Sequence, residues 1–104
     1  HQFCQIGDYS LVGGGSVILK DVAAMTLVSG NPAAAHGLNI EGMRRKQWSK
    51  ETINTLRAAY KLIFKSGKTT EQVIQELNVD YLPQEPKVQL LIDSLVKSNR
   101  GITR

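Results

Sequence analysis

A six-residue step recurs from Ile6 to Ala23 and restricts the fold of this chain more than any other feature. Each step begins with an aliphatic residue and carries a small or β-branched residue at its fifth place. Flat strands and tight turns can alternate with this period, so that aliphatic side chains point inward and glycine takes the corners where φ is positive. Strict apolar-polar alternation is absent, which favours a short-repeat parallel β-helix over a hairpin. The aliphatic positions are Ile6, Val12 and Ile18.

The segment of repeats is too short to be stable by itself. Three steps make about one coil of a triangular helix, and about three or more units are needed to bury a continuous core. We therefore expect further coils before His1, or cover by another chain; a coincidental phase in a glycine-rich loop is the alternative. Cys4, the only cysteine, occupies the small place of a step. That position explains the residue better than a nucleophilic role, since no local group would activate the thiol.

The charge of the chain is concentrated in its middle third. Residues 1–35 carry one Lys against two Asp, residues 36–68 carry eight Lys or Arg against two Glu, and residues 69–104 carry four against five. Such a positive field favours an anionic partner: a phosphate-bearing ligand, an acidic protein or nucleic acid. The longest stretch without a charged residue, 22–40, is interrupted by Gly, Asn and Pro, so no membrane span is expected.

Two helical patterns occupy the middle of the chain. Asn39 can cap a short helix that runs through Lys46, with an acidic residue in its first turn and basic residues in its last. Ser49 caps a second helix, which Gly67 ends. Cations recur in this helix at four-residue spacing and form a stripe beside its apolar face. They are Arg57, Lys61 and Lys65.

Two further helical patterns complete the chain. Thr69 and Gln72 form a capping-box pair at the start of the third helix, and residues 81–83 form a connector. Pro86 suits the first turn of a last helix that stops at Gly101. Its apolar side comprises Val88, Leu91, Ile92, Leu95 and Val96. The sequence therefore predicts a mixed β and α fold, with terminal β-helix coils in residues 1–35 and an α-helical bundle in residues 36–104.

The junction between the two parts, residues 36–46, is the candidate ligand site. It places an amide, a carboxylate and three cations within residues 39–46, a combination that suits a polar anionic ligand held between two domains. A capped and solvated helix start is the alternative. His36, at the start of the junction, is interpreted as a loop histidine and not as a catalytic one.

Several stretches of the sequence match a known pattern. They are His1 to Cys4, the six-residue steps, Gly30 to Pro32, Gly37 to Gly42 with Arg44 and Arg45, Ala59 to Ile63, and Arg100 to Ile102. Together they resemble the C-terminal part of the UDP-N-acetylglucosamine O-acyltransferases that begin lipid A synthesis. The resemblance covers the whole chain, and its most specific parts are the opening and the junction.

The resemblance implies a homotrimer of left-handed parallel β-helices in the cytoplasm, each with a C-terminal helical domain, and active sites between neighbouring subunits. The implied reaction moves an (R)-3-hydroxyacyl group from acyl carrier protein to the 3-hydroxyl of UDP-N-acetylglucosamine. A histidine is the general base, the acyl thioester is the donor, and no metal or other cofactor is required. In the family that base lies upstream of the stretch seen here, so no catalytic residue is expected in this chain.

Positions that match the family's motifs carry the implied binding site. His1 and Gln2 resemble a substrate-contacting pair near the sugar and phosphates. Asn39, Glu41 and Arg45 resemble the UDP-binding set, in which an arginine pairs with a phosphate and an amide or carboxylate meets uridine hydroxyls or base.

Two other features receive roles from the resemblance. Gly14 resembles the position whose side-chain size limits the acyl pocket. The cationic stripe of Arg57, Lys61 and Lys65 is a hypothesis for docking the acidic acyl carrier protein, and an ordinary solvated helix face is its alternative.

Other functions stay open from the residues alone. One is another hexapeptide acyltransferase, such as the N-acyltransferase that acts later in the same pathway, although the junction favours the O-acyltransferase. Another is a noncatalytic basic interaction or nucleic-acid-binding module. No aromatic residues interleave the cations as a stacking platform for single strands would require, so a nucleic-acid partner is not expected. A third is that His1 itself serves as the base.

Overall fold

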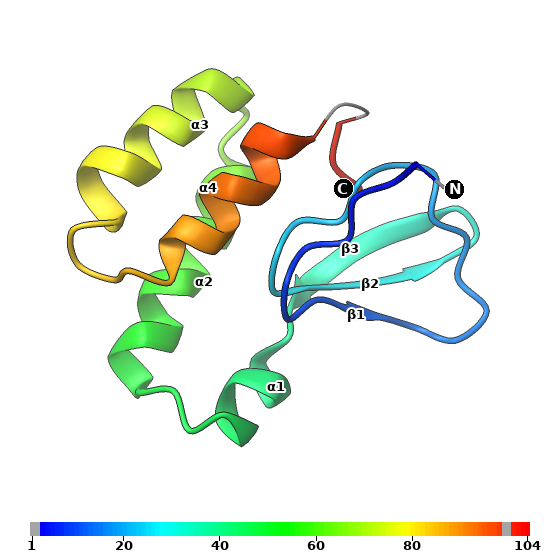
Figure 1. Cartoon of the computed structure of the whole chain (residues 1–104), viewed down its shortest axis with the longest axis horizontal. Helices are drawn as coiled ribbons and strands as arrows, with labels where there is room; N and C mark the ends of the chain where they lie inside the picture. Colours follow the sequence, from blue (N-terminus) through cyan, green and yellow to red (C-terminus); the bar gives the residue numbers. More distant parts are fainter. Residues whose placement is uncertain (1–2, 99–100) are drawn as a thin grey trace.

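The chain folds into a small β-sheet coil packed beside a group of helices (Figure 1). A computed structural model describes residues 3–98 and 101–104. The strands are β1 (Leu11–Val12), β2 (Thr26–Gly30) and β3 (Ala33–Leu38). The helices are α1 (Ile40–Arg45), α2 (Lys50–Lys65), α3 (Thr70–Glu76), the π-helix η1 (Leu77–Tyr81) and α4 (Val88–Lys97).

The coil is built by parallel pairing between its successive turns. Leu11 pairs with Leu27 where β1 runs parallel to β2, and Ile6 pairs with Val22 in an isolated parallel bridge. Paired positions therefore lie slightly closer in the sequence than the three six-residue steps that were predicted to make about one coil. Tyr9 and Met25, which occupy equivalent places in the two turns, both take a left-handed conformation with φ of 60°.

The outer coil leaves its aliphatic residues open to solvent. Ile6 is 52% exposed and Val12 is 39% exposed, as expected of a coil that needs cover by further coils or by another chain. The physical reason is that they lie in the first turn, over which no described segment packs. In the second turn the equivalent residues are covered: Val22 and Val28 are fully buried.

The sheet ends in an antiparallel hairpin that leads into the helices. β3 pairs antiparallel with β2, and the strand order is β1-β2-β3. β3 runs across the predicted boundary between residues 35 and 36, and the division of the chain into two parts stays a prediction. His36 lies in this strand, not in a loop, so the interpretation of His36 as a loop histidine is wrong.

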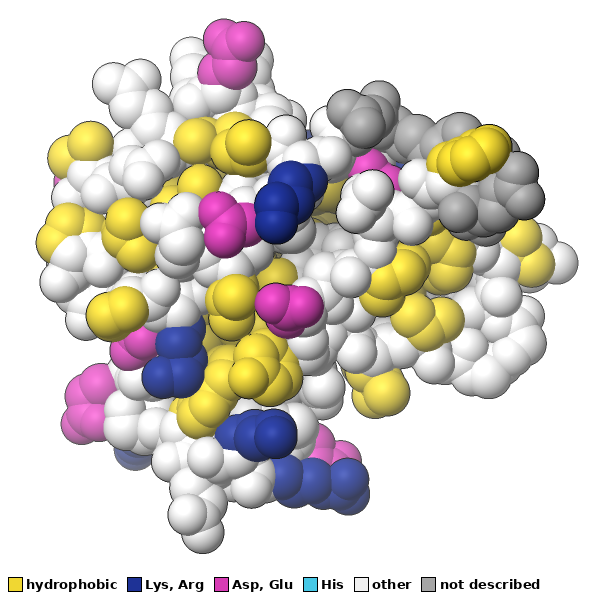
Figure 2. Space-filling model, viewed as in Figure 1, with side chains coloured by type: hydrophobic (Ala, Val, Ile, Leu, Met, Phe, Trp, Pro, Cys, Tyr) yellow, Lys and Arg dark blue, Asp and Glu magenta, His cyan; other side chains and the backbone are white. Residues whose placement is uncertain are grey.

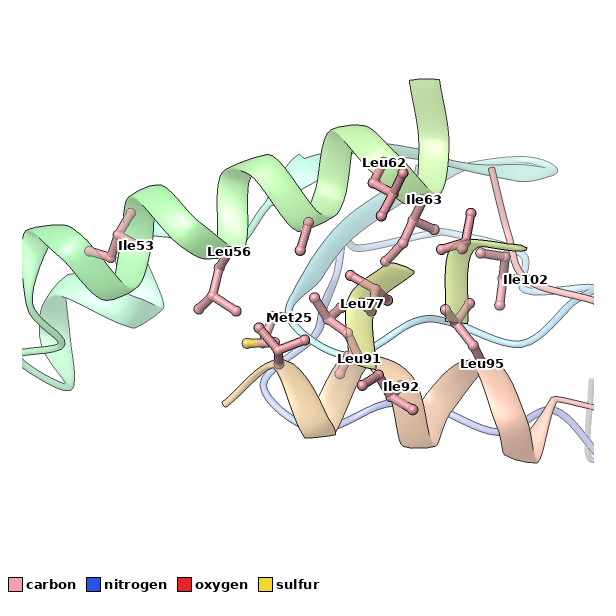
Figure 3. Packing of buried hydrophobic residues seen from close by; sticks show 14 of the residues in the cluster. Met25, Ile53, Leu56, Leu62, Ile63, Leu77, Leu91, Ile92, Leu95 and Ile102 are labelled. Carbon is pink, nitrogen blue, oxygen red and sulfur yellow. The ribbon is translucent and has the colours of Figure 1, made fainter. Parts of the chain in front are cut away.

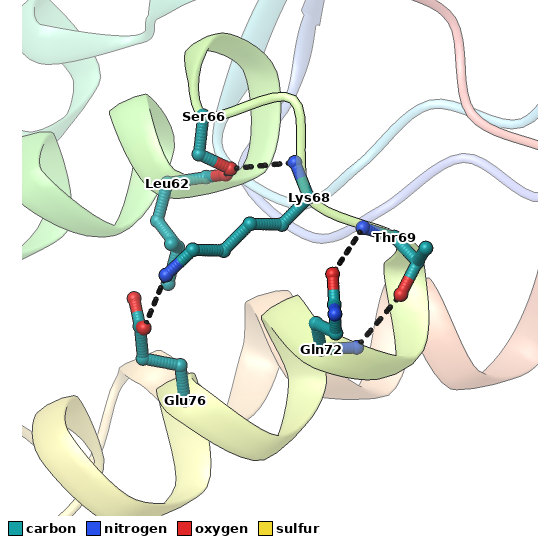
Figure 4. A network of polar contacts seen from close by, with 6 residues as sticks. All are labelled: Leu62, Ser66, Lys68, Thr69, Gln72 and Glu76. Atoms are coloured by element: carbon teal, nitrogen blue, oxygen red, sulfur yellow. Dashed lines mark hydrogen bonds and ion pairs between the residues drawn. The ribbon is translucent and has the colours of Figure 1, made fainter.

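The helix starts agree with the predicted caps. Asn39 caps α1 by accepting from the Gly42 N–H, and Ser49 caps α2 by accepting from the Thr52 N–H. Thr69 and Gln72 form the capping box of α3 (Figure 4).

The helix ends and the last helix differ from the prediction in detail. α4 begins at Val88, so Pro86 lies in the turn before the helix and not in its first turn. It ends at Lys97, ahead of Gly101, whose φ is +79°. Val96 is exposed, whereas the other four predicted apolar residues of α4 are buried.

One hydrophobic core joins the coil to the helices. Met25, from the corner between the coil and β2, lies among side chains of α2 and α4 (Figure 3). Ile102 from the C-terminal tail closes the same core. Large side chains that are fully buried in it include Leu56, Leu77, Leu91 and Val88. The helices are therefore held against the coil by shared apolar burial and not by surface contacts alone.

The C-terminal tail is paired with the coil. Asp21 donates its N–H to the Gly101 carbonyl and accepts from the Thr103 N–H, at 3.0 and 2.6 Å. The buried Asp21 carboxylate also accepts from the Gln5 N–H and from the Ser98 hydroxyl. The first turn of the coil, the end of α4 and the tail thus meet at one residue, Asp21.

Candidate functional site

Asn39 lies between the end of β3 and the start of α1, and its backbone and side chain both make hydrogen bonds there. Its N–H donates to the Met25 carbonyl at 2.8 Å, and its side-chain Oδ1 accepts from the Gly42 N–H at 3.1 Å. Its Nδ2 donates to the Tyr9 carbonyl at 3.1 Å. A Cβ at position 42 would lie 2.5 Å from Asn39 Nδ2, so glycine is needed there for the cap to close.

The two charged members of the predicted nucleotide set lie one turn apart on α1. Arg45 Nη2 donates to Glu41 Oε1 at 2.8 Å, and the side chains are 78% and 75% exposed. An exposed pair of this kind contributes little to stability. An incoming anion can therefore take over the guanidinium at small cost, and the freed carboxylate becomes available as an acceptor.

More positive charge surrounds this pair. Arg44 is exposed in the last turn of α1, and Lys46 caps the helix C-terminus with its Nζ 6.0 Å from the centre of the Tyr9 ring. Figure 2 shows basic side chains gathered over α1 and α2 beside a hydrophobic patch, whereas the visible described coil surface carries little charge. The predicted concentration of cations in the middle third thus becomes a local positive surface.

A groove runs beside the junction, between the end of β3 and α2. It has a volume of about 590 Å³, and its lining includes Leu38, Ile40 and Tyr60. Partial burial raises the pKa of the Tyr60 hydroxyl. The three residues of the predicted cationic stripe also line the groove: Arg57, Lys61 and Lys65. An apolar channel edged by three cations suits a partner that presents both apolar and acidic side chains.

The remaining predicted positions fall in different places. Gly14 lies in the outer coil, and a Cβ added there would have no atom within 4 Å, so the space around it is open. His1 and Gln2 lie outside the described residues. His36 is exposed on β3, with its Nε2 3.4 Å from the Ser29 carbonyl.

Sequence reasoning missed an aromatic cluster at the base of α1. Tyr9 of the coil and Trp48 after α1 are in edge-to-face contact, with ring centres 5.2 Å apart. Lys87 Nζ lies 5.1 Å from the centre of the Trp48 ring. No local pattern could have found this cluster, because its members come from three distant parts of the chain.

Two absences concern the part of the chain that the structure describes. No group of three or more His, Cys, Asp or Glu side chains there could hold a metal ion. Within the same residues, every helix is too short or too polar to cross a membrane.

The architecture and the junction define a class of protein: a parallel β-helix coil followed by helices, with cations concentrated at the junction between them. The family model for UDP-N-acetylglucosamine O-acyltransferase, domain 2, matches residues 21–103. The chain therefore belongs to the UDP-N-acetylglucosamine O-acyltransferase family, which confirms the resemblance and the mixed fold predicted from the sequence.

Curated relatives support the same family. The acyl-[acyl-carrier-protein]–UDP-N-acetylglucosamine O-acyltransferase of Psychrobacter sp. (strain PRwf-1) is 88% identical over 90 residues, which are 86% of this chain and 35% of that protein. The protein of the same name from Ectopseudomonas mendocina (strain ymp) is 50% identical over the whole chain and 40% of its own length. This chain thus spans little more than a third of the length of these relatives.

Solved structures give the same picture. LpxA from Acinetobacter baumannii matches the whole chain with a TM-score of 0.97 and 62% identity, over 40% of its own length. The UDP-N-acetylglucosamine O-acyltransferase of Moraxella catarrhalis RH4 matches with a TM-score of 0.97 and 59% identity, again over 40% of its length.

Proposed function

We propose that this chain is the C-terminal part of an acyltransferase that moves an (R)-3-hydroxyacyl group from acyl carrier protein to the 3-hydroxyl of UDP-N-acetylglucosamine, the first step of lipid A synthesis. The observation that carries the proposal is the 88% identity to a relative named acyl-[acyl-carrier-protein]–UDP-N-acetylglucosamine O-acyltransferase. The exposed Glu41–Arg45 pair supports it, because it offers a guanidinium to a diphosphate and a carboxylate to hydroxyl groups.

The roles of individual residues follow from their chemistry. Arg45 exchanges Glu41 for a phosphate oxygen. The side-chain amide of Asn39 holds α1 in place by capping its first turn. His1 and Gln2 complete the substrate contacts in this proposal. The general base that removes the proton of the sugar hydroxyl is a histidine outside this chain, and the reaction needs no metal because the thioester is already an activated acyl donor.

The acyl chain and the assembly belong to the same proposal. Gly14 leaves room for a longer acyl chain, since the space around it is open. A larger side chain at position 14 is expected to shift the preference of the parent enzyme toward shorter donors, as measured by comparing kcat/KM for donors of different length. The parent protein acts as a homotrimer in the cytoplasm, with active sites between subunits.

Acyl transfer by this chain and by its full-length parent provides the first test. With equal concentrations of both, product is expected only from the parent, because the base is missing here. Product from both would mean that a histidine of this chain is the base and would overturn that assignment. In the parent, Arg45→Ala is expected to raise the KM for UDP-N-acetylglucosamine about tenfold or more, as loss of one charge-assisted contact does.

We also propose that the cation-edged groove docks the acyl carrier protein. Arg57, Lys61 and Lys65 line the groove together with the apolar Leu38 and Ile40, so acidic and apolar side chains of one partner helix can be met together. Reversing Arg57 and Lys61 to Glu is expected to raise the KM for the acyl carrier substrate and to leave the KM for UDP-N-acetylglucosamine near its original value. An unchanged KM for the carrier would reject the docking role, and the matched control is charge reversal at Lys97 on α4.

A further inference from the structure

The helix that carries the proposed nucleotide contacts is too short to hold its own position. α1 has six residues, of which Met43 alone is buried. Isolated helices shorter than about 12 residues are marginal in water. The position of the Glu41 and Arg45 side chains must therefore be set by what α1 is attached to at its two ends.

The attachment at the end of α1 is aromatic. The Trp48 N–H donates to the Met43 carbonyl at 3.1 Å, which fixes the turn after the helix. The Trp48 ring meets the Tyr9 ring at 5.2 Å with an interplanar angle of 76°, the preferred edge-to-face arrangement. This contact ties the turn to the first coil, which lies far earlier in the sequence.

The attachment at the start of α1 leads to the same tyrosine. The Asn39 amide accepts from Gly42 and donates to the Tyr9 carbonyl, so one side chain both begins the helix and holds the backbone of Tyr9. Tyr9 has a φ of 60°, a left-handed conformation that a non-glycine residue keeps only where its surroundings impose it. Tyr9 thus contacts both ends of α1, through its carbonyl at one end and its ring at the other.

From this geometry we propose that Tyr9 and Trp48 are positioning residues for the nucleotide: they clamp α1 against the coil and so hold Arg45 and Glu41 ready to bind. The inference rests on the proposed function. Tyr9 is 47% exposed, so its ring is not part of the hydrophobic core that holds the fold. Without the clamp, α1 samples other orientations, and the affinity falls by the fraction of time spent in the competent one.

The test uses the full-length natural protein with Tyr9→Ala, Tyr9→Phe and Val79→Ala, the last being a matched exposed position on η1. Tyr9→Ala is expected to raise the KM for UDP-N-acetylglucosamine about five- to tenfold, with kcat and the KM for the acyl carrier substrate within about twofold of the original. Tyr9→Phe keeps the ring and is expected to keep the original KM for UDP-N-acetylglucosamine. The Val79→Ala control is expected to keep it as well. Equal losses in both KM values together with a lowered Tm would mean a merely structural role and would overturn the proposal.

A double-mutant cycle separates this inference from the function on which it rests. If Tyr9 acts through Arg45, then Tyr9→Ala in an Arg45→Ala background should add less than about twofold, whereas independent effects would multiply. Arg45→Ala alone with an unchanged KM for UDP-N-acetylglucosamine would reject the proposed nucleotide site. A raised KM for Arg45→Ala beside an unchanged KM for Tyr9→Ala would reject the clamp alone, and so would full multiplication of the two effects.

Discussion

At the scale of single residues, two glycines of the coil have opposite surroundings. A Cβ at Gly7 would lie 2.4 Å from the Ala24 backbone nitrogen, because the two turns of the coil touch there. A Cβ at Gly14 would have no neighbour within 4 Å. The glycine-rich segment thus contains one position, Gly7, where the contact between turns leaves no room for a side chain. At another position, Gly14, a side chain has room.

Alanine substitutions at Gly7 and Gly14 should have different effects on the free energy of unfolding. Gly7→Ala is expected to lower the free energy of unfolding by about 1–3 kcal/mol, because the turns must move apart. Gly14→Ala should leave it unchanged or raise it by up to about 1 kcal/mol, since a residue with fewer unfolded conformations is gained without a clash. Urea unfolding of both variants measures the difference. Equal values for the pair would show that the two turns do not approach as closely as described.

Glu85 gives the chain a pH-dependent contribution to its stability. Burial opposes its charge and is the largest single influence. Hydrogen bonds from the Thr52 hydroxyl and the Lys87 N–H, together with the Lys87 charge, outweigh the burial and hold the pKa of Glu85 below its ordinary value of 4.5. Since the folded pKa is lowered, this stability is fully present above pH 4.5 and is lost as the pH falls through the folded pKa.

Glu85→Gln should therefore destabilise the chain most at neutral pH. The expected loss in the free energy of unfolding is about 1–3 kcal/mol at about pH 7, as for hydrogen bonds to a charged group, and the loss should shrink below about pH 4. If the two proteins differed by the same free energy of unfolding at every pH in this range, the assignment would be contradicted. Glu51→Gln, at an exposed position in the first turn of α2, serves as the control.

At the scale of elements, the helix starts that carry a side-chain cap could be predicted from the sequence, whereas the limits of α4 and the strand register could not. Each cap lies close to its partner in the sequence, as with Asn39 and Gly42, so the signal is local. The register of the coil depends on which segments stack, and the two corner residues, Tyr9 and Met25, are not the glycines that a left-handed conformation favours. The end of α4 was also set by distant contacts, because the chain must leave the helix early to reach Asp21.

In the candidate site, too, contacts between residues near in the sequence could be predicted and contacts between distant residues could not. The Glu41–Arg45 pair follows from four-residue spacing on a helix, and the sequence alone could predict it. The contact between Tyr9 and Trp48 joins distant parts of the sequence and has no local signature.

The capping box of α3 offers a test at this scale. The Thr69 hydroxyl accepts from the Gln72 N–H at 3.2 Å, and Gln72 Oε1 accepts from the Thr69 N–H at 3.0 Å (Figure 4). Nearby, hydrogen bonding to Glu76 raises the pKa of the exposed Lys68. Thr69→Ala is expected to cost about 1 kcal/mol and to speed hydrogen exchange in the first turn of α3. Thr70→Ala, one position into the helix, should cost clearly less; the reverse order would reject the cap.

At the scale of the whole molecule, the coil and the helices share one core, which the tail closes. Ile102 is buried, and the neighbouring Arg104 donates to the Ile63 carbonyl at the end of α2 at 2.9 Å. The tail therefore touches the second turn of the coil on one side and α2 on the other. Loss of its contacts should weaken both parts together.

Ile102→Ala is expected to lower the free energy of unfolding by about 2–5 kcal/mol, in the range for truncating a buried isoleucine. Val96→Ala, at an exposed position on α4, should change it by less than about 0.5 kcal/mol. Thermal unfolding followed separately by the signals of the helices and of the coil should show one shared transition for Ile102→Ala. Two separate transitions would mean that the tail does not couple the two parts.

The pairing of the tail with Asp21 also sets an order of events during protein synthesis. Residues 101–104 leave the ribosome after every other part of this sequence, yet they supply partners for the backbone of Asp21, which was made much earlier. Until residues 101–104 have been made, the Asp21 backbone lacks these partners and Ile102 is missing from the core. Removal of residues 101–104 would therefore leave the described helices and strands in the chain but take away the backbone partners of Asp21.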